Sequence, residues 1–548
     1  MRSSSKSIFV SILIVITLLG MSLSAIPVNQ NKELEKEETK FFSHTNVNFE
    51  GYQEDSVYSY STLTSGGYTQ CIITEDQRVV CWGSNDQGKR GLGGGTDNAS
   101  LTPQGKAGPW LVGNLSAGMV EVSTGAWSTC SLKETGEIWC WGGGQYGQLG
   151  TGSDACQGYP GAEACTGATN HPPVEVSLPV NRTAVSLSDA NQGHFCAILD
   201  NGDGICWGWN NQGQLGDGTV CTGGNYWYDA SNPTPAGCNP NNGRYTPAVI
   251  DDSNFPVDSS FISISTGFHH SCGIIDNNDL YCWGQNNNGQ LGIGLAGNNN
   301  YPTPQFVDSN VIAVGTGDQH SCALYMNQNV KCWGANNNGQ LGSGNNYLYS
   351  SPSLINLSTN IRLISLETAY NSACVISEDF VPYCWGSNSF SQLGNDGTDN
   401  SQENPLLFWN PDYDFEDNTT TAMSINGEMV CQIIGQSSDN STHNHRDLFC
   451  NGQAWRGQVG DGSWNQTWSD WNYNFVNLSS DNVGPLSYQG AGGVHIPERD
   501  IDNDSTIGIL DNLPNGCPDG SYDSNYDGSC VPADAGYFST NIMYNEQL

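Results

Sequence analysis

"CWGQNNNGQLGIG", residues 282–294, is a phrase rich in Asn, Gln and Gly that carries one Cys, one Trp and one Leu. It is one of six similar versions, which begin at Cys81, Cys140, Cys206, Cys282, Cys332 and Cys384. A seventh copy, "CNGQAWRGQVGDG" from Cys450, has Asn451 in place of the Trp. The shortest unit, from Cys272 to Cys322, is 50 residues long. This period indicates a propeller or a solenoid rather than one large core.

Each unit also predicts a β-hairpin in front of the phrase. In "CSLKETGEIWCWG", residues 130–142, apolar and β-forming residues flank the turn sequence "ETGE". An upstream piece such as "NVIAVGTGDQHSCAL", residues 310–324, adds another short strand. No segment of the array has a sustained helical period. The sequence therefore predicts blades of three or four antiparallel strands.

The repeated residues resemble the regulator of chromosome condensation repeat family, in which G-x-x-H-x-C/T-x-x-L is followed by WG-x-N-x-x-GQLG-x-G. The resemblance covers Thr62 to Asn482 and is to a secreted prokaryotic type. It implies an all-β fold, a seven-bladed β-propeller that is rich in disulfides. In such a fold the Trp and Leu of each phrase are core residues, and the Asn and Gly residues build a loop. His194, His270 and His320 recur in register before a blade Cys, so we interpret them as structural.

The 20 cysteines fall into ten local pairs, which predict disulfides in an exported chain. Seven pairs belong to the blades: Cys71 with Cys81, Cys130 with Cys140, Cys196 with Cys206, Cys272 with Cys282, Cys322 with Cys332, Cys374 with Cys384, and Cys431 with Cys450. The other three are Cys156 with Cys165, Cys221 with Cys238, and Cys517 with Cys530.

The N-terminal stretch predicts export. Residues 1–24 contain Arg2, Lys6 and a short apolar run, which together are typical of a signal peptide. The mature chain has no other segment apolar enough to span a membrane, so we expect a secreted or cell-surface glycoprotein with nine N-x-S/T sequons. We divide the chain into a signal peptide (1–24), a linker with a candidate closing strand (25–60), the propeller (61–485) and an acidic C-terminal segment (486–548).

The composition excludes some partners. The chain has 17 Lys and Arg against 55 Asp and Glu, and such an acidic field repels phosphate backbones, so no nucleic-acid partner is expected. Chromatin-type guanine-nucleotide exchange carries over poorly to an exported, acidic chain.

The C-terminal segment contains two candidate calcium loops, because oxygen-bearing residues stand at positions 1, 3, 5 and 12 of each. These residues are Asp500, Asp502, Asp504 and Asp511 in the first loop, and Asp523, Asn525, Asp527 and Asp534 in the second. The second stretch also resembles one cysteine-rich unit of ephrin-receptor-like repeats, and in that interpretation its acids are turn residues. We expect no other cofactor.

If the repeat is scaffold, function is expected where the blades depart from it. The aromatic residues after the repeat phrase are the candidate binding residues: Tyr226, Trp227, Tyr228, Phe408, Trp409, Trp464, Trp468 and Trp471. They occupy equivalent repeat positions, which predicts that they project from one face. The alternative is that they pack their own long loops onto the body.

Two classes of function remain. The first is a non-catalytic scaffold that binds an extracellular protein or glycan through one propeller face. The second is an extracellular enzyme that acts on glycans with carboxylates in the face loops. The sequence contains no compact nucleophile–base motif, which favours the first class and no enzymatic activity.

Overall fold

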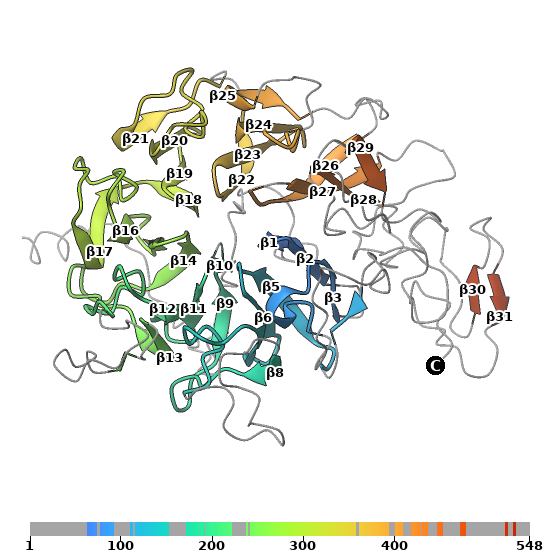
Figure 1. The fold of residues 1–548 in the computed structure, drawn as a ribbon, viewed down its shortest axis with the longest axis horizontal. Coiled ribbons are helices and arrows are strands. Elements are labelled where there is room, and N and C mark those ends of the chain that lie inside the picture. The colour runs from blue at the N-terminus through green and yellow to red at the C-terminus, as the bar shows by residue number, and fades with distance from the viewer. Residues whose placement is uncertain are drawn as a thin grey trace, which may run out of the picture. The chain divides into compact units, whose positions relative to one another are not determined.

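The computed structural model describes residues 63–73, 77–91, 110–112, 115–152, 171–190, 192–221, 237–238, 242–357, 361–393, 400–408, 418–427, 429–436, 447–452, 472–477, 521–523 and 530–532. Nearly all strands in these residues belong to seven sheets that follow one another along the chain (Figure 1). The predicted all-β, seven-bladed propeller is confirmed.

Each blade is built on four antiparallel strands. Blade one contains β1 (Leu63–Gly66), β2 (Thr69–Ile73), β3 (Val79–Gly83) and β4 (Trp110–Leu111), with the 3-10 turn η2 (Asp86–Gly88). Blade two contains β5 (Met119–Thr124), β6 (Ser128–Lys133), β7 (Ile138–Gly142) and β8 (His171–Glu175). Blade three contains β9 (Ala184–Leu187), β11 (His194–Leu199), β12 (Gly204–Trp209) and β13 (Gly243–Val249). Blade four contains β14 (Phe261–Thr266), β15 (His270–Ile275), β16 (Leu280–Gln285) and β17 (Asn300–Asp308).

The remaining blades repeat this order. Blade five contains β18 (Val311–Thr316), β19 (His320–Tyr325), β20 (Val330–Gly334) and β21 (Tyr349–Leu354). Blade six contains β22 (Leu363–Ala369), β23 (Ser372–Ser377), β24 (Pro382–Ser387) and β25 (Ser401–Leu407). Blade seven contains β26 (Asn418–Ile425), β27 (Met429–Gln436), β28 (Asp447–Gly452) and β29 (Asn472–Asn477).

Two short elements stand outside this pattern. The two-residue strand β10 (Asp189–Ala190) follows β9 along the chain and pairs in parallel with β14 of blade four. A separate hairpin pairs β30 (Ser521–Asp523) with β31 (Cys530–Pro532).

The central hairpin of each blade places its two cysteines directly opposite each other. In blade four Cys272 pairs with Cys282, and their Cα atoms are 4.0 Å apart. Disulfides join the two cysteines of all seven blades, and an eighth joins Cys221 to Cys238. The predicted pairs Cys156–Cys165 and Cys517–Cys530 include residues outside the described part of the chain.

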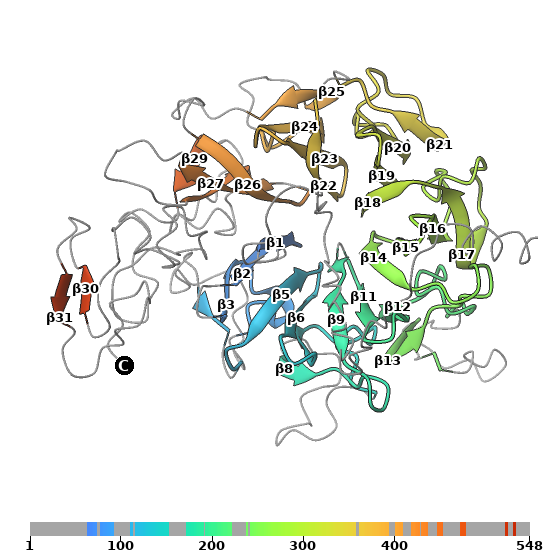
Figure 2. The ribbon, with the colours of Figure 1, turned by 180° about the vertical axis from the view of Figure 1, so that it is seen from behind.

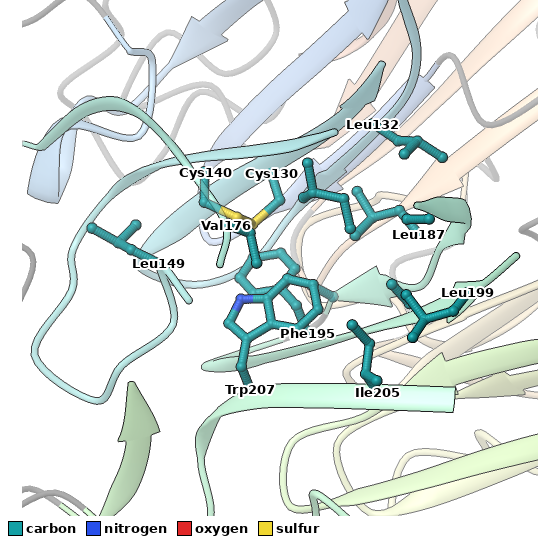
Figure 3. Close-up of a cluster of buried hydrophobic side chains, with 14 residues drawn as sticks. Cys130, Leu132, Cys140, Leu149, Val176, Leu187, Phe195, Leu199, Ile205 and Trp207 are labelled. Atoms are coloured by element: carbon teal, nitrogen blue, oxygen red, sulfur yellow. A yellow bond between two sulfur atoms is a disulfide. The ribbon is translucent and has the colours of Figure 1, made fainter. Parts of the chain in front are cut away.

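The repeat tryptophans of blades two to six connect each of these blades to the one before it. The buried ring of Trp283 donates its indole N–H to the carbonyl of Gln214 in blade three, at 2.9 Å. Equivalent bonds join Trp141 to Lys89, Trp207 to Gln148, Trp333 to Gln290 and Trp385 to Gln340. Figure 3 shows Trp207 packed on Phe195 and Val176 beside the disulfide of blade two. The core therefore lies between blades as well as within them.

The polar residues of the phrase fold its loop. In blade four the side-chain oxygen of Asn286 accepts the N–H of Leu291 at 3.1 Å, and that of Gln290 accepts the N–H of Asn288 at 2.9 Å. Gly292 has φ of 74°, and a Cβ on it would meet the ring of Trp333 at 2.7 Å. Only glycine meets both conditions, so the phrase encodes architecture.

The ring closes without strand exchange in the part of the chain that the structure describes. β1 pairs with β2 of its own blade, and β29 pairs with β28 of its own blade. Instead, β1 contacts β26, and the Gln70 side chain donates to the Met429 sulfur at 2.8 Å (Figures 1 and 2). The sequence also predicts that a strand from Ser56 to Thr64, or one near Phe475 to Tyr488, completes a blade at the opposite end of the array. Residues 56–62 and 478–488 lie outside the described part of the chain, so this stays a prediction.

Among the residues described, no helix has the length and apolar character needed to cross a bilayer.

Candidate functional site

The two ends of each blade carry different loops. We call the end with the turn between the first and second strands the upper end. The connection from the third to the fourth strand starts beside this turn, as the bond from Gly143 N–H to the Trp127 carbonyl shows in blade two (2.7 Å). The lower end carries the hairpin tips between the second and third strands.

Five aromatic rings from three consecutive blades meet at the upper end. They are Trp127 and Tyr146 of blade two, Trp209 of blade three, and Phe268 and His269 of blade four. We call them the aromatic cluster.

Trp209 is the hub of the aromatic cluster. Its ring stacks on Tyr146 with centroids 5.1 Å apart and planes 23° apart. It meets Trp127 edge-on at 5.7 Å and His269 edge-on at 4.5 Å. Phe268 lies 5.9 Å from Trp209 and 4.2 Å from His269. Ring centroids at such distances are those of favourable aromatic pairs, so the cluster is one connected surface.

A glycine makes room for the two tryptophans. Gly193 stands where blades four, five and six carry His269, Gln319 and Asn371. A Cβ on Gly193 would lie 2.8 Å from the ring of Trp127 and 3.4 Å from that of Trp209. The ring of Trp127 therefore occupies space that a side chain fills in those blades.

The cluster is partly exposed and uncharged. All five rings are intermediate in burial, whereas the repeat tryptophans are fully buried. Burial lowers the pKa of His269 to about 4, so its ring is neutral at physiological pH. The Gln214 amide lies 3.4 Å from Nδ1 of His269. Since an amide N–H only donates, this nitrogen accepts and the proton lies on Nε2.

Six segments at the upper end of blades two to four carry no Asp, Glu, Lys or Arg, although the blade-three loops at this end also contain Asp189 and Asp217. These segments are residues 125–128, 143–149, 190–193, 209–215, 266–269 and 285–291. Asp217 forms an ion pair with Arg244 of β13. The lower end differs, because the hairpin tips of blades two, three, four and six carry acids: Glu134, Glu137, Asp200, Asp203, Asp276, Asp279, Glu378 and Asp379. The six uncharged segments thus lie at one end of these blades and the acidic tips at the other.

Buried histidines tie the blades together below the upper-end turns. Nε2 of His194 lies 2.8 Å from the Ser271 hydroxyl of the next blade, and His270 makes the same contact with Ser321. Burial lowers the pKa of His194 and His270 to about 3 and that of His320 to about 4. These residues are structural, as their register predicts.

One acid is also buried at the upper end. Asp318 lies largely buried in the upper-end turn of blade five, and burial raises its pKa to about 7. It is not part of the six segments by sequence, but its carboxyl group forms a hydrogen bond with the side chain of Gln192 in the 190–193 segment.

Of the predicted binding residues, Phe408 is the one whose side chain the structure describes. It is 1% exposed and packs in the core with Leu393 and Met423. Its N–H bonds the Pro382 carbonyl, at the start of β24, which places it at the lower end of blade six. Phe408 is therefore a core residue, and the expectation that it projects with the other aromatics from one face is wrong. It follows the fourth strand rather than the third, and antiparallel strands put those connections at opposite ends.

The other predicted binding residues lie outside the described part of the chain: Tyr226, Trp227, Tyr228, Trp409, Trp464, Trp468 and Trp471. The same holds for the side chains of both candidate calcium loops. Among the residues described, no three His, Cys, Asp or Glu side chains form a group that could hold a metal ion.

The aromatic cluster is absent from the binding residues predicted above, although the sequence contains a signal for it. Trp209 stands at the third position after its blade cysteine, where the other five Trp-containing phrases have Ser, Gly, Gln or Ala. Tyr146 stands at the sixth position after its blade cysteine, where blades one, three, four and five have Gln or Asn. Comparing the copies position by position would have identified these substitutions, whereas attention to the longest insertions did not.

Comparisons with known proteins agree with this fold. The chain matches the RCC1-like domain family over residues 33–424. It is 28% identical over 275 residues to the ultraviolet-B receptor UVR8 of Arabidopsis thaliana, which covers 43% of this chain and 56% of that protein. It is 29% identical over 159 residues to the E3 ubiquitin-protein ligase HERC2 of Homo sapiens, covering 28% of this chain and 3% of that one. The chain thus spans little more than half of the first relative and a small part of the second.

Solved structures show the same architecture. Yeast RCC1 (Prp20) bound to Kap60 superposes with a TM-score of 0.57 at 17% identity, covering 79% of this chain and 90% of that one. Human WBSCR16 gives a TM-score of 0.55 at 16% identity, covering 73% and 93%. Because the family match extends over more than half of the sequence, the chain belongs to the RCC1-like domain family.

Proposed function

We propose that this protein is an exported, non-catalytic recognition scaffold that binds its partner at the upper end of blades two to four. Propellers of this family often mediate protein binding. The predicted signal peptide and the eight disulfides support export, since such bonds persist in oxidising compartments.

The aromatic cluster carries the proposal. Its tryptophans are not at the repeat positions that hold adjacent blades together, and they are partly exposed. Aromatic side chains supply a large contact area and lose few rotamers on binding. Their positions are also set in advance, because Trp209 continues a strand and its N–H bonds the Gly193 carbonyl at 2.9 Å. A preorganised, partly exposed group of aromatic side chains is typical of a binding hot spot.

The alternative, a glycan-acting enzyme, requires two carboxyl groups about 5–9.5 Å apart. The six segments around the cluster contain no carboxylate. Our proposal therefore assigns the cluster to binding. Guanine-nucleotide exchange is not part of the proposal.

The test combines binding and turnover measurements on the purified full chain. Affinity capture from the native surroundings, with the tag at the C-terminus, is run alongside a glycan array and a panel of glycoside hydrolase substrates. We expect a bound partner that is lost in Trp209→Ala while the folded state is retained, and no turnover. Turnover, or a partner whose binding is indifferent to Trp209, would contradict the proposal.

A further inference from the structure

The ligand class follows from the chemistry that surrounds the aromatic cluster. In a chain with 55 Asp and Glu, the six upper-end segments of blades two to four hold no acid and no Lys or Arg. Their histidine, His269, is neutral, because burial lowers its pKa to about 4. A ligand over the rings meets mainly aromatic rings and carboxamides. Of the acids in the adjoining upper-end loops, Asp217 is paired with Arg244, and Asp318 is buried with its pKa raised to about 7, while Asp189 lies in the blade-three turn. An anionic or cationic ligand would lose its hydration there without an ionic partner.

Carboxamides border the rings. Gln145, next to Tyr146, is exposed, and Asn211 and Gln212, which follow Trp209, are partly exposed. In the adjoining blades, the Asn288 amide donates to the Gln319 side-chain oxygen at 2.8 Å, which fixes both groups. A carboxamide has a donor and an acceptor, and a sugar hydroxyl also donates and accepts. A carboxamide and a pair of sugar hydroxyls can therefore form two hydrogen bonds without any charged group.

Uncharged rings and carboxamides together fit one ligand class better than the others. The C–H faces of a pyranose ring pack on an aromatic face, while its hydroxyls bond groups at the edge. A protein epitope is instead commonly engaged through Arg and an ionic rim, and nucleic acid requires cations.

We propose that the aromatic cluster with its carboxamide border binds a neutral glycan, a chain of uncharged hexose or N-acetylhexosamine units. The sugar rings stack on Trp127 and Trp209, and Gln145 and Asn211 bond the hydroxyls. This inference rests on the proposed recognition function and names its ligand class.

Gly193 decides whether the site exists. It has no positive φ, so its backbone accepts other residues, and the obstacle to a side chain is the ring of Trp127 at 2.8 Å. Gly193→Gln introduces the residue that blade five carries at this position, Gln319. The variant is expected to displace the tryptophan rings while the blade retains its fold.

The experiment uses the full chain and defined saccharides. Isothermal titration calorimetry and tryptophan fluorescence measure binding of cellohexaose, laminarihexaose, mannohexaose, maltohexaose and chitohexaose, with hexagalacturonate and heparin as charged probes. We expect at least one neutral hexasaccharide to bind, and Trp209→Ala and Gly193→Gln to weaken it tenfold or more. Tyr347→Ala is the matched control, because Tyr347 is 74% exposed in blade five, and it should leave binding unchanged. Thermal unfolding of every variant separates loss of the site from loss of the fold.

The outcomes separate this inference from the proposed function. Binding of charged probes alone, of no neutral saccharide, or of a neutral saccharide equally well by wild type and Gly193→Gln overturns the glycan inference. If a captured protein instead depends on Trp209, the recognition function stands and its ligand is a protein. If no partner of either class depends on Trp209, both are wrong.

Discussion

Trp283 and Trp209 illustrate two uses of one residue type in neighbouring blades. Trp283 stands directly after its blade cysteine, is fully buried and donates to the carbonyl of the preceding blade. Trp209 stands two positions further along its own phrase, is partly exposed and contacts four other rings. Residues that match the repeat pattern thus build the scaffold, and a substitution at a surface position of the pattern creates a candidate site.

Substitutions relative to the repeat pattern also occur at buried positions, where they cannot contribute to a binding surface. Lys89 replaces the phrase Gln in blade one and is 1% exposed. Ala373 replaces the hydroxyl residue that pairs with a buried histidine in blades four and five. Such departures are expected to lower stability rather than to add function, and this contrast can be measured.

The largest expected effect is the difference in stability between the Trp283→Ala and Trp209→Ala variants. Trp283→Ala leaves a large cavity between blades and removes the hydrogen bond to Gln214, so we expect it to lower the free energy of unfolding by about 3–5 kcal/mol. Trp209→Ala removes a partly exposed ring and should cost less than about 1.5 kcal/mol. Chemical denaturation of both variants measures the difference. Equal destabilisation would show that the aromatic cluster is merely core.

Acid should weaken the scaffold through its buried histidines. The folded-state pKa of His270 is about 3 and its usual value is 6.5, so the unfolded chain binds the extra proton between these values. The stabilisation is complete above pH 6.5 and is lost as the pH falls towards 3. At pH 5 this loss amounts to about 2 kcal/mol for one such histidine. Asp318, with its raised pKa, acts in the opposite direction.

His270→Gln tests this linkage. Unfolding at pH 7.5, 6 and 5 should show a shallower loss of stability for the variant than for wild type. Parallel pH profiles for the two proteins would contradict it.

Lys89 should be a stabilising site to replace. Burial lowers its folded-state pKa to about 7, well below the usual 10.5, so stability is lost as the pH falls from 10.5 towards 7. Lys89→Gln restores the repeat residue and should stabilise the protein by about 1–2 kcal/mol at pH 7. The gain should shrink at pH 10, where the lysine is neutral in the folded state. Denaturant midpoints at the two pH values decide this.

The smallest effect concerns the last histidine of the series. His194 and His270 each meet a serine hydroxyl of the next blade, but Ala373 stands at the position that would face His320. Ala373→Ser should supply the hydroxyl and raise the free energy of unfolding by about 0.5–1.5 kcal/mol, measured by denaturant titration. Ala323→Ser, at a fully buried site in blade five, is the control and should be destabilising. A loss of stability in both variants would contradict the expected histidine contact.

The sequence by itself determined the propeller, its blade number and the cysteine pairs of its hairpins. These features depend on contacts within one repeat, and the same local pattern occurs in seven copies, so each copy supports the same assignment. The positions of Trp, Asn and Gly in "CWGQNNNGQLGIG" were enough to assign each to core or loop, because hairpin register and left-handed turns are local properties.

The tertiary structure alone decided where the blades meet. Trp127, Tyr146, Trp209, Phe268 and His269 are far apart in the sequence, and no local pattern brings them together. Nor could the sequence place Phe408. A residue after the third strand lies at the upper end of the blade and a residue after the fourth strand lies at the lower end, and the sequence did not show which strand Phe408 follows. The candidate site consists of side chains from three blades that contact one another, with the rings of Trp127 and Trp209 in the space beside Gly193. Such contacts form only when the blades assemble into the ring.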